Sequence, residues 1–274
     1  MDVYIHGGLR SPIGVVHGQY KTLRPEVLGA RLINELSARN TITSVDGIFC
    51  GNAVGTGGNL GRLMGLMTNL PESVPAVTVD MQCASALMSI EMAYTHIKAG
   101  VMCSAIAGGV ESSSLQPRRT YAYGDDRAGS YMVAQFSPHD QSPRTMLEGA
   151  ERTIRKYNIA KEALYPYIIE SHQKAGAARS NQMLSQYIMP LEINGKICRD
   201  ECIRPTMNEK LLGRMKPLLG PDSITNAGNA CLTHDGGAFV YLRNRKGPFR
   251  IHSMLPWAGD PQYSPEGALE STKA

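Results

Sequence analysis

The sequence predicts an α/β fold from the order of its strand and helix patterns. A strand-like run from Val74 to Val79 passes into a helix-period segment, and a short run of small residues at 104–107 follows as a second strand that ends in a turn at Gly108–Gly109. Gly100 stands where a residue just beyond a helix C-terminus is expected. The 274 residues are 42% hydrophobic and 19% charged, which is ordinary for a globular chain of one large or two modest domains. A strand–helix–strand unit of this kind is typical of a parallel sheet.

The segments before this unit also have clear patterns. Val3 to Ile5 and Val45 to Cys50 are typical of strands, and Pro25 to Ser37 is an amphipathic helix with leucines four residues apart and proline in its first turn. The glycine-rich stretch from Gly55 to Arg62 lacks both the Lys-Ser/Thr ending of a phosphate loop and the spacing of a dinucleotide fingerprint. We therefore expect it to be a turn that leads into a helix.

After residue 115 the composition changes. The stretch 117–143 holds few aliphatic residues and predicts an extended excursion from the core. The segments that follow predict helices, then a polar hairpin, a short helix and two strands, and a last helix that begins at Glu266. Their expected ranges are 150–159 and 161–179, then 189–205, 208–215, 240–242 and 249–254.

Cys83 is a candidate nucleophile because it lies where the strand passes into the helix. The helical spacing places Cys83, Leu87, Ile90, Tyr94 and Ile97 on one face, which puts the thiol in the first turn. The first turn of a helix carries unpaired N–H groups and about half a positive charge, which stabilise a thiolate. The alternative is that Cys83 is a small buried hydrophobic residue, as most free cysteines are.

Charge and cysteine content exclude several classes of protein. A net charge of +4 without blocks of like charge argues against nucleic-acid binding, and no apolar run approaches membrane-spanning length. The first six residues do not form a signal peptide, and six cysteines are too sparse for a disulfide scaffold. Cys198 and Cys202 have a spacing that zinc could use, but no second pair accompanies them, so we expect no metal site. A cytoplasmic location fits best.

The segment Val79–Leu87 resembles the acyl-accepting cysteine motif of thiolases, and Ile106–Ser112 looks like the strand and turn that follow it in that family. The resemblance continues in order to about residue 270. It implies a layered α/β thiolase fold with an N-terminal core over 1–116 and an inserted, mainly helical loop domain that binds coenzyme A over 117–224. Residues 225–274 would hold the return strand and the start of the C-terminal half. The other matching segments are 7–14, 55–62, 171–175, 226–230 and 235–238.

The resemblance implies a thiolase-type acyltransferase that acts on acyl-CoA thioesters by Claisen condensation or thiolysis. Cys83 would form the acyl-enzyme, Arg204 would lie near the nucleotide end of coenzyme A, and Met146 and Cys231 would line the pantetheine channel. Coenzyme A would be a substrate, and no covalently bound cofactor is implied. A histidine at 172 would more often be a surface residue than a catalytic one.

Four positions depart from the family pattern. Asp80 and Ala86 stand where the family usually has asparagine and glycine, and Cys231 and Thr145 stand where it usually has serine and often histidine. A carboxylate near the thiol opposes thiolate formation, and a methyl group at 86 crowds a close backbone approach.

The resemblance covers only the first half of a thiolase and its loop domain. The Gly-His-Pro segment and second cysteine of the other half are not found, since His234 is followed by Asp235 and His252 by Ser253. Half of the layered core would expose an apolar face, so we expect a homodimer or a hetero-oligomer, and truncation of a longer protein is favoured over a natural half-enzyme.

Two other functions stay open at this point. The chain could be a catalytically inactive coenzyme A-binding or assembly subunit whose partner carries the C-terminal half, which the departures at 80, 86 and 231 favour. A ketoacyl synthase shares the nucleophilic cysteine but generally lacks a loop domain with the 171–175 type of sequence, so it ranks last.

Overall fold

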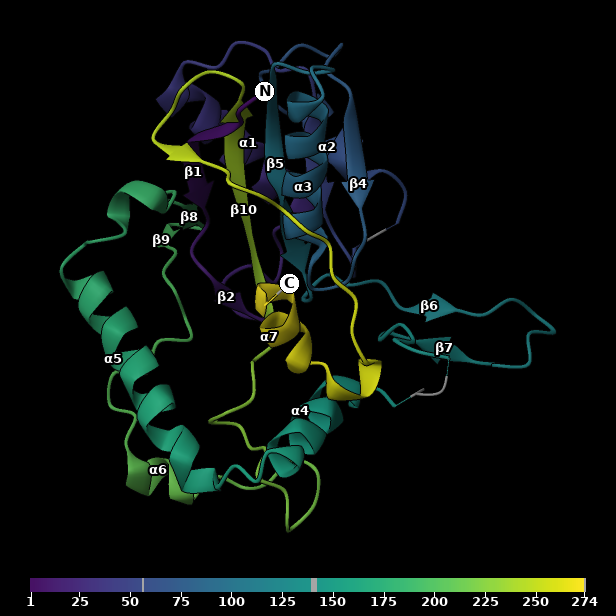
Figure 1. The fold of residues 1–274 in the computed structure, drawn as a ribbon, viewed down its shortest axis with the longest axis vertical. Helices are drawn as coiled ribbons and strands as arrows, with labels where there is room; N and C mark the ends of the chain where they lie inside the picture. The colour runs from purple at the N-terminus through teal and green to yellow at the C-terminus, as the bar shows by residue number, and fades with distance from the viewer. Residues whose placement is uncertain (56, 139–141, 274) are drawn as a thin grey trace. The chain divides into compact units, whose positions relative to one another are not determined.

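A computed structural model describes residues 1–55, 57–138 and 142–273, and the chain divides into two compact units (Figure 1). The first, here called the sheet unit, comprises Met1–Pro117, Leu184–Cys202 and Thr233–Met254. The second, the helical unit, comprises Arg118–Met183, Ile203–Leu232 and Leu255–Ala274. The functional domain boundaries predicted after residues 116 and 224 stay a proposal.

The sheet unit is built on one mixed seven-stranded sheet. Its strand order is β11-β1-β10-β5-β3-β4, with β2 paired to β10. Strand β3 runs parallel to β4 on one side and β5 on the other, and the remaining pairs are antiparallel. The predicted parallel strand–helix–strand unit is therefore confirmed. The strands are β1 (Tyr4–Arg10), β2 (Gly14–Val15), β3 (Ile48–Gly51), β4 (Ala76–Val79), β5 (Ser104–Ser112), β10 (His234–Arg243) and β11 (Phe249–Arg250).

Helices cover both faces of this sheet because its central strands are apolar on both sides. Helices α1 (Pro25–Asn40) and α2 (Leu60–Leu66) pack on one face, where Ile48 and Cys50 point. Helix α3 (Ser85–Lys98) lies on the other face (Figure 1). Phe49 belongs to the apolar cluster on that face. A short 3₁₀ turn (Ser185–Tyr187) and the hairpin β8–β9 (Glu192–Ile193 and Lys196–Ile197) complete the unit.

Strand β5 differs from its prediction. The sequence predicted a turn at Gly108–Gly109, and this prediction is wrong because the strand runs on to Ser112. Its neighbours lie so close that a Cβ at Gly108 would fall 2.0 Å from the Ala238 carbonyl oxygen. The glycines of this segment permit close strand packing instead of a turn.

Helix α3 begins later and is rotated relative to its prediction. It starts at Ser85, so Cys83 precedes the first turn, and Leu87 is 64% exposed. The buried face consists of Ser85, Ser89, Ala93 and Ile97, because small side chains let the helix approach the glycine-rich strands. Beyond the C-terminus Gly100 has φ +78°, as predicted.

The helical unit has a small apolar core formed by Tyr165, Met207 and Leu212.

Helix α4 begins five residues before the predicted start, and the helix predicted from 161 divides into a 3₁₀ turn and α5. Of the glycine-rich segment before α2, Thr56 lies outside the described residues. The elements of the unit are β6–β7 (Arg119–Thr120 and Ser130–Tyr131), α4 (Thr145–Lys156), α5 (Tyr165–Ser180), α6 (Glu209–Gly213), α7 (Glu266–Lys273) and 3₁₀ turns at Lys161–Leu164 and Pro261–Tyr263.

We predict that Gly51→Ala destabilises the protein by about 1–3 kcal/mol, because the new Cβ would lie 2.5 Å from the Ala86 nitrogen. Urea unfolding followed by circular dichroism measures this change. Gly65→Ala is the control, since its Cβ would meet atoms no nearer than 3.5 Å and alanine favours the helix by roughly 0.5–1 kcal/mol. Equal stability of the two variants would contradict the packing argument.

Candidate active site

Cys83 lies at a sharp turn between β4 and α3. Gln82 before it has φ +52°, a left-handed conformation that is uncommon outside glycine. The Asp80 carboxylate stabilises this conformation by accepting the Gln82 N–H at 2.9 Å. The Ser85 hydroxyl accepts the Met81 N–H at 2.8 Å and donates to the Gln82 carbonyl at 2.6 Å. The turn is thus fixed on both sides of Cys83, whose side chain is exposed and not buried as the alternative required.

Close backbone packing supports this turn from behind. Gly51 at the end of β3 faces the first residues of α3, and Gly109 on β5 lies beside Ala86. A Cβ at Gly109 would fall 3.2 Å from the Ala86 Cβ, so the missing side chain of Gly109 leaves room for that methyl group. The crowding expected from alanine at 86 is accommodated in this way.

A second loop is fixed beside the turn by Glu111 on β5. Its carboxylate accepts the N–H groups of Ala53 and Val54 at 2.8 and 3.0 Å, and the Asn52 side-chain amide at 2.8 Å. The loop after β3 and the turn after β4 therefore meet at the carboxyl edge of the parallel strands. Ligands of open α/β sheets bind at that edge. Sequence reasoning missed Glu111, because its role depends on strand pairing.

In the helical unit, Met146 lies in the first turn of α4 and is 43% exposed. One turn further along this helix, buried Glu151 accepts the N–H of Thr225 at 2.9 Å and its hydroxyl at 2.8 Å. Burial raises the pKa of Glu151, but hydrogen bonds from Thr225, Ile224 and Ser223 outweigh burial and hold it below its usual range. Glu151 thereby attaches the segment before Cys231 to α4.

Cys231 is exposed and follows a turn that is closed by asparagines. Asn226 accepts the Gly228 N–H at 2.8 Å, and the Asn229 side chain accepts the Asn226 N–H at 2.7 Å. The Cys231 thiol contacts the Leu232 carbonyl at 3.3 Å. This arrangement gives the predicted channel residue a well-defined position in the helical unit.

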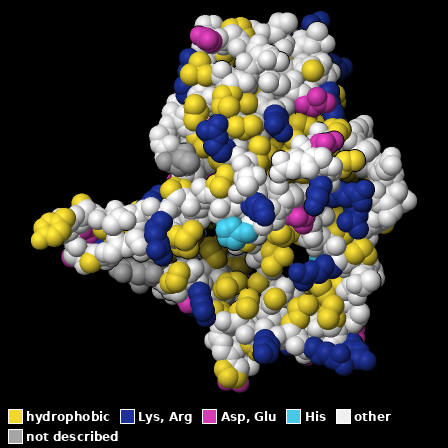
Figure 2. Space-filling view, turned by 180° about the vertical axis from the view of Figure 1, so that it is seen from behind, with side chains coloured by type: hydrophobic (Ala, Val, Ile, Leu, Met, Phe, Trp, Pro, Cys, Tyr) yellow, Lys and Arg dark blue, Asp and Glu magenta, His cyan; other side chains and the backbone are white. Residues whose placement is uncertain are grey.

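Arg204 lies against α5, where its N–H donates to the His172 Nδ1 at 3.2 Å. Burial lowers the pKa of His172, and the positive charge of Arg204 lowers it further. Arg204 itself is exposed. On the face in Figure 2, Lys and Arg are interspersed with apolar side chains, which suits an amphipathic anionic ligand.

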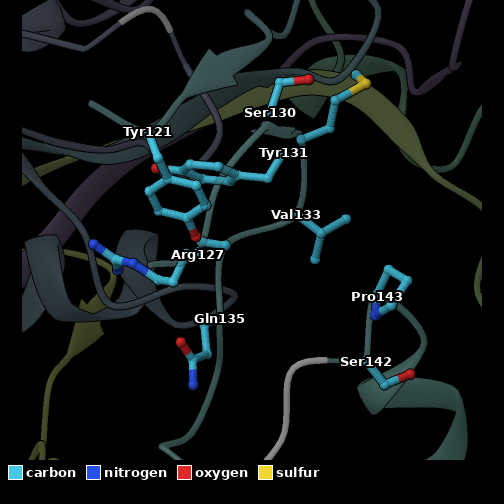
Figure 3. Close-up of a pocket in the computed structure, with 10 residues that line it drawn as sticks. Tyr121, Arg127, Ser130, Tyr131, Val133, Gln135, Ser142 and Pro143 are labelled. Carbon is cyan, nitrogen blue, oxygen red and sulfur yellow. The ribbon is translucent and has the colours of Figure 1, made fainter. Parts of the chain in front are cut away.

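The helical unit also contains a pocket of about 350 Å³ that sequence reasoning missed (Figure 3). Tyr121 and Tyr131 stack across the β6–β7 pair with ring centroids 4.7 Å apart, and the Arg127 guanidinium lies 4.3 Å from the Tyr121 ring centre. Arg127 is also paired with Asp125 at 2.7 Å. In the sequence, the only indication of this pocket was the abundance of Tyr and Arg in residues 117–143.

The described residues contain no group of three or more His, Cys, Asp or Glu arranged to hold a metal ion. Cys198 is buried, and burial raises its pKa, whereas Cys202 contacts His234. Within the described part of the chain, none of the helices combines the length and apolarity that crossing a bilayer requires.

Comparison with solved structures shows a thiolase fold. The crystal structure of the Bacillus anthracis acetyl-CoA acetyltransferase is similar with a TM-score of 0.78 and 26% identity, over 88% of this chain and 65% of that chain. Human mitochondrial 3-ketoacyl-CoA thiolase, solved in complex with CoA, gives a TM-score of 0.79 over 88% of this chain and 64% of that chain. At 24% identity, this second likeness shows the fold alone.

Sequence comparison places the chain within a family. Residues 3–246 match the family model "Thiolase, N-terminal domain". A Staphylococcus epidermidis protein provisionally named acetyl-CoA C-acetyltransferase VraB is 34% identical over 240 residues, 85% of this chain and 62% of that protein. Its Staphylococcus aureus counterpart is 32% identical over 256 residues, 90% of this chain and 67% of that protein. The chain belongs to the thiolase family, as predicted, and spans about two thirds or less of these relatives.

We predict that thiol-specific labelling distinguishes the exposed Cys83 from the buried Cys50. Burial raises the pKa of the Cys50 thiol to about 12, so it carries almost no thiolate near neutral pH. Iodoacetamide at pH 7.5, followed by peptide mass spectrometry, should modify Cys83 in the native protein and Cys50 only after denaturant is added. Labelling of Cys50 before Cys83 would contradict this arrangement.

We also predict that Glu151→Gln destabilises the protein by about 1–3 kcal/mol at pH 7, since the carboxylate accepts several buried hydrogen bonds. Because the folded-state pKa is lowered, this stabilisation is present above about pH 4.5 and is lost as the pH falls through the folded-state pKa. The difference from wild type should therefore shrink in acid.

Urea unfolding between pH 3 and 7 measures that difference. Glu170→Gln is the matched control, because its ion pair with Lys174 on α5 is 58% exposed at the carboxylate and contributes about 0–0.5 kcal/mol. A Glu151→Gln effect that is no larger than the control, or that grows in acid, would refute the assignment.

Proposed function

We propose that this chain is the acyl-accepting portion of a thiolase-type acyltransferase. Its substrates are acyl-CoA thioesters, and its reaction is Claisen condensation or thiolysis of a 3-ketoacyl-CoA through an acylated Cys83. The observation that carries the proposal is the exposed Cys83 thiol, held in a fixed turn immediately before α3. Membership of the thiolase family supports it.

The chemistry of the first step suits this position. The Cys83 sulfur forms a bond to the acyl carbon, the thioester C–S bond breaks, and coenzyme A leaves as a thiol. The N-terminus of α3 presents backbone N–H groups and the positive end of the helix dipole, which favour the thiolate and the developing oxyanion. Asp80 opposes thiolate formation by its charge, although its carboxylate also accepts the Gln82 N–H.

Coenzyme A is proposed to bind residues of the helical unit. Arg204 would contact the nucleotide end through its exposed guanidinium, and Met146 and Cys231 would line the pantetheine arm. All three side chains are exposed. The segment before Cys231 is held by the turn that Asn226 closes and by the hydrogen bonds from Thr225 to Glu151. A role in fatty acid metabolism and a cytoplasmic location follow from the same proposal.

A partner is proposed for the second half of the reaction. The chain spans 62% of its Staphylococcus epidermidis relative. Carbon–carbon bond formation needs a positioned base beside the acyl-enzyme. We propose that a second copy or a different chain contributes this base and covers apolar side chains such as Leu87, which is 64% exposed.

A second candidate function is a coenzyme A-binding or assembly subunit without catalysis. The departure at Cys231 favours it, because a thiol is a weaker hydrogen-bond donor than the hydroxyl expected there. The two functions differ in one property, which is whether a covalent acyl-enzyme forms at Cys83.

We predict that incubation with acetyl-CoA acetylates Cys83 of the wild-type chain. The variant Cys83→Ala should lose acetylation of this peptide, because the sulfur is the acceptor, while it still binds coenzyme A. Peptide mass spectrometry and isothermal titration calorimetry measure the two properties. The exposed Cys103→Ala is the matched control and should acylate as wild type does.

Binding of coenzyme A without any adduct on Cys83 would favour the assembly subunit. Neither binding nor an adduct would refute both functions for the chain by itself.

A further inference from the structure

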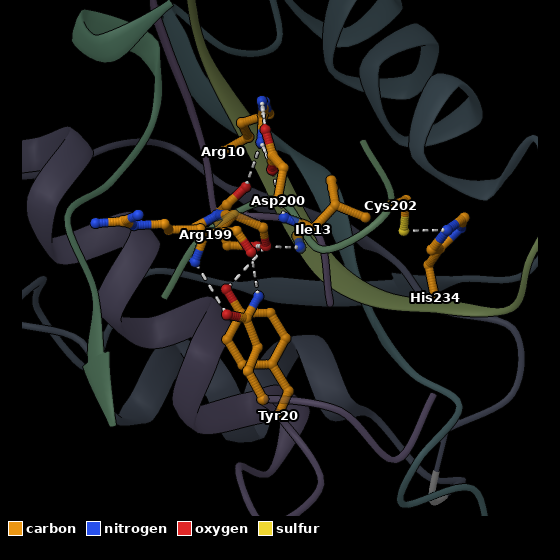
Figure 4. A network of polar contacts seen from close by, with 11 residues as sticks. Arg10, Ile13, Tyr20, Arg199, Asp200, Cys202 and His234 are labelled. Atoms are coloured by element: carbon orange, nitrogen blue, oxygen red, sulfur yellow. Dashed lines mark hydrogen bonds and ion pairs between the residues drawn. The ribbon is translucent and has the colours of Figure 1, made fainter. Parts of the chain in front are cut away.

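Apart from the turn at Cys83, the sheet unit contains Cys202, whose thiol contacts a histidine imidazole. The Cys202 sulfur and the His234 Nε2 lie 2.9 Å apart, and both side chains are partly buried (Figure 4). The two residues are 32 positions apart, so the pair exists only because the fold brings them together. A thiol and an imidazole in hydrogen-bond contact form the basic unit of nucleophilic cysteine chemistry.

The backbone that carries Cys202 is firmly fixed. Asp200 makes a two-pronged ion pair with Arg10 at 2.8 and 2.9 Å and accepts the Ile13 N–H at 2.7 Å (Figure 4). The Glu201 N–H then donates to the Ile13 carbonyl at 3.0 Å. The two residues before Cys202 are therefore attached to the loop that follows β1, which limits the movement of its thiol.

The backbone of His234 is held by β2, which lies in the same segment after β1. His234 begins β10 and pairs with Val15 of β2, and its carbonyl accepts the Ser113 hydroxyl at 3.2 Å. The next residue, Asp235, is 1% exposed and accepts the Ser114 N–H at 3.0 Å. Strand pairing therefore holds the histidine, and the Arg10–Asp200 ion pair holds the segment just before the cysteine. Such preorganisation is typical of a reactive site.

We propose that Cys202 is a second acyl-accepting thiol and that His234 is its general base, with small thioesters as the substrate class. The proton of the Cys202 thiol passes to the His234 Nε2, and the sulfur forms a bond to the thioester carbonyl carbon. The bond between that carbon and the donor sulfur breaks, and the departing thiolate takes the proton from the imidazolium. The products are an acylated Cys202 and a free thiol, so atoms and charge balance.

The choice of thioester rests on the proposed function, which makes acyl thioesters the electrophiles that this chain meets. The reactivity of the pair does not rest on it. Cys83 depends on a helix terminus, whereas Cys202 has an imidazole in direct contact. The two sulfurs can therefore be tested separately, with different acyl donors.

The test uses the Cys83→Ala chain and the acetyl thioester of N-acetylcysteamine, a donor without the nucleotide of coenzyme A. We expect peptide mass spectrometry to find Cys202 acetylated faster than the exposed Cys103, whose backbone N–H donates to Asp46. Adding His234→Asn should slow acetylation of Cys202 by roughly 10²-fold, the lower end of general-base contributions, and leave Cys103 unchanged. The advantage of Cys202 should persist at pH 6, where an unassisted thiol reacts slowly.

Two results would overturn the proposal. One is acetylation of Cys202 no faster than that of Cys103. The other is acetylation of Cys202 at the same rate in the chain with His234 and in the His234→Asn variant. If His234→Asn does not fold, as judged by circular dichroism, the pH profiles of Cys202 and Cys103 in the parent chain decide the question, and parallel profiles refute the proposal.

Failure here can be distinguished from failure of the proposed function. A Cys202→Ala chain incubated with acetyl-CoA reports on Cys83 when peptide mapping locates the acetyl group. An adduct there, without reaction of Cys202 in the first experiment, would leave the thiolase assignment intact and remove only the second thiol.

Discussion

The close approach of α3 to the sheet is the constraint on which the candidate site depends. The helix can reach the strands only because Gly51 and Gly109 present no side chains to its first turn. Ser89 adds a polar contact, since its hydroxyl donates to the Gly108 carbonyl at 2.7 Å and accepts the Gly108 N–H at 2.9 Å. Fixing the start of α3 in this way fixes the turn before it, and hence the exposed position of Cys83.

Carboxylates organise the loops around this packed centre in a consistent way. Glu111, Asp200 and Glu151 each accept two or more hydrogen bonds from a segment distant in sequence, and for Asp200 these come from the Ile13 N–H and the Arg10 guanidinium. A carboxylate has acceptor capacity for several donors, and charge-assisted hydrogen bonds are stronger than neutral ones. Loops that would otherwise be mobile are thereby attached to strands or helices, and residues beside each attachment gain fixed positions.

The α/β fold class could be predicted from local patterns, which are the strand before Cys83, the helix period after it and glycine at 100, whereas the family was predicted from the resemblance of residues 79–87 and 106–112 to thiolase motifs. The rotation of α3 could not, since apolar spacing favoured a face with Leu87, while the sheet selects small residues such as Ser89. The Cys202–His234 contact was equally out of reach, because the two residues meet only after β10 has paired with the rest of the sheet. Patterns within one element predict that element, whereas contacts between elements require the tertiary structure.

The two sulfurs differ in the physical origin of their expected reactivity. At Cys83 the proposed favourable interaction is with the terminus of α3, an electrostatic effect that salt screens. At Cys202 the proposed proton acceptor is the His234 Nε2, which lies 2.9 Å from the sulfur in a contact that salt affects much less. A helix terminus stabilises a thiolate but cannot take up its proton, whereas an imidazole does both. If both thiols act as proposed, the reaction at Cys83 depends on ionic strength and the reaction at Cys202 depends on His234.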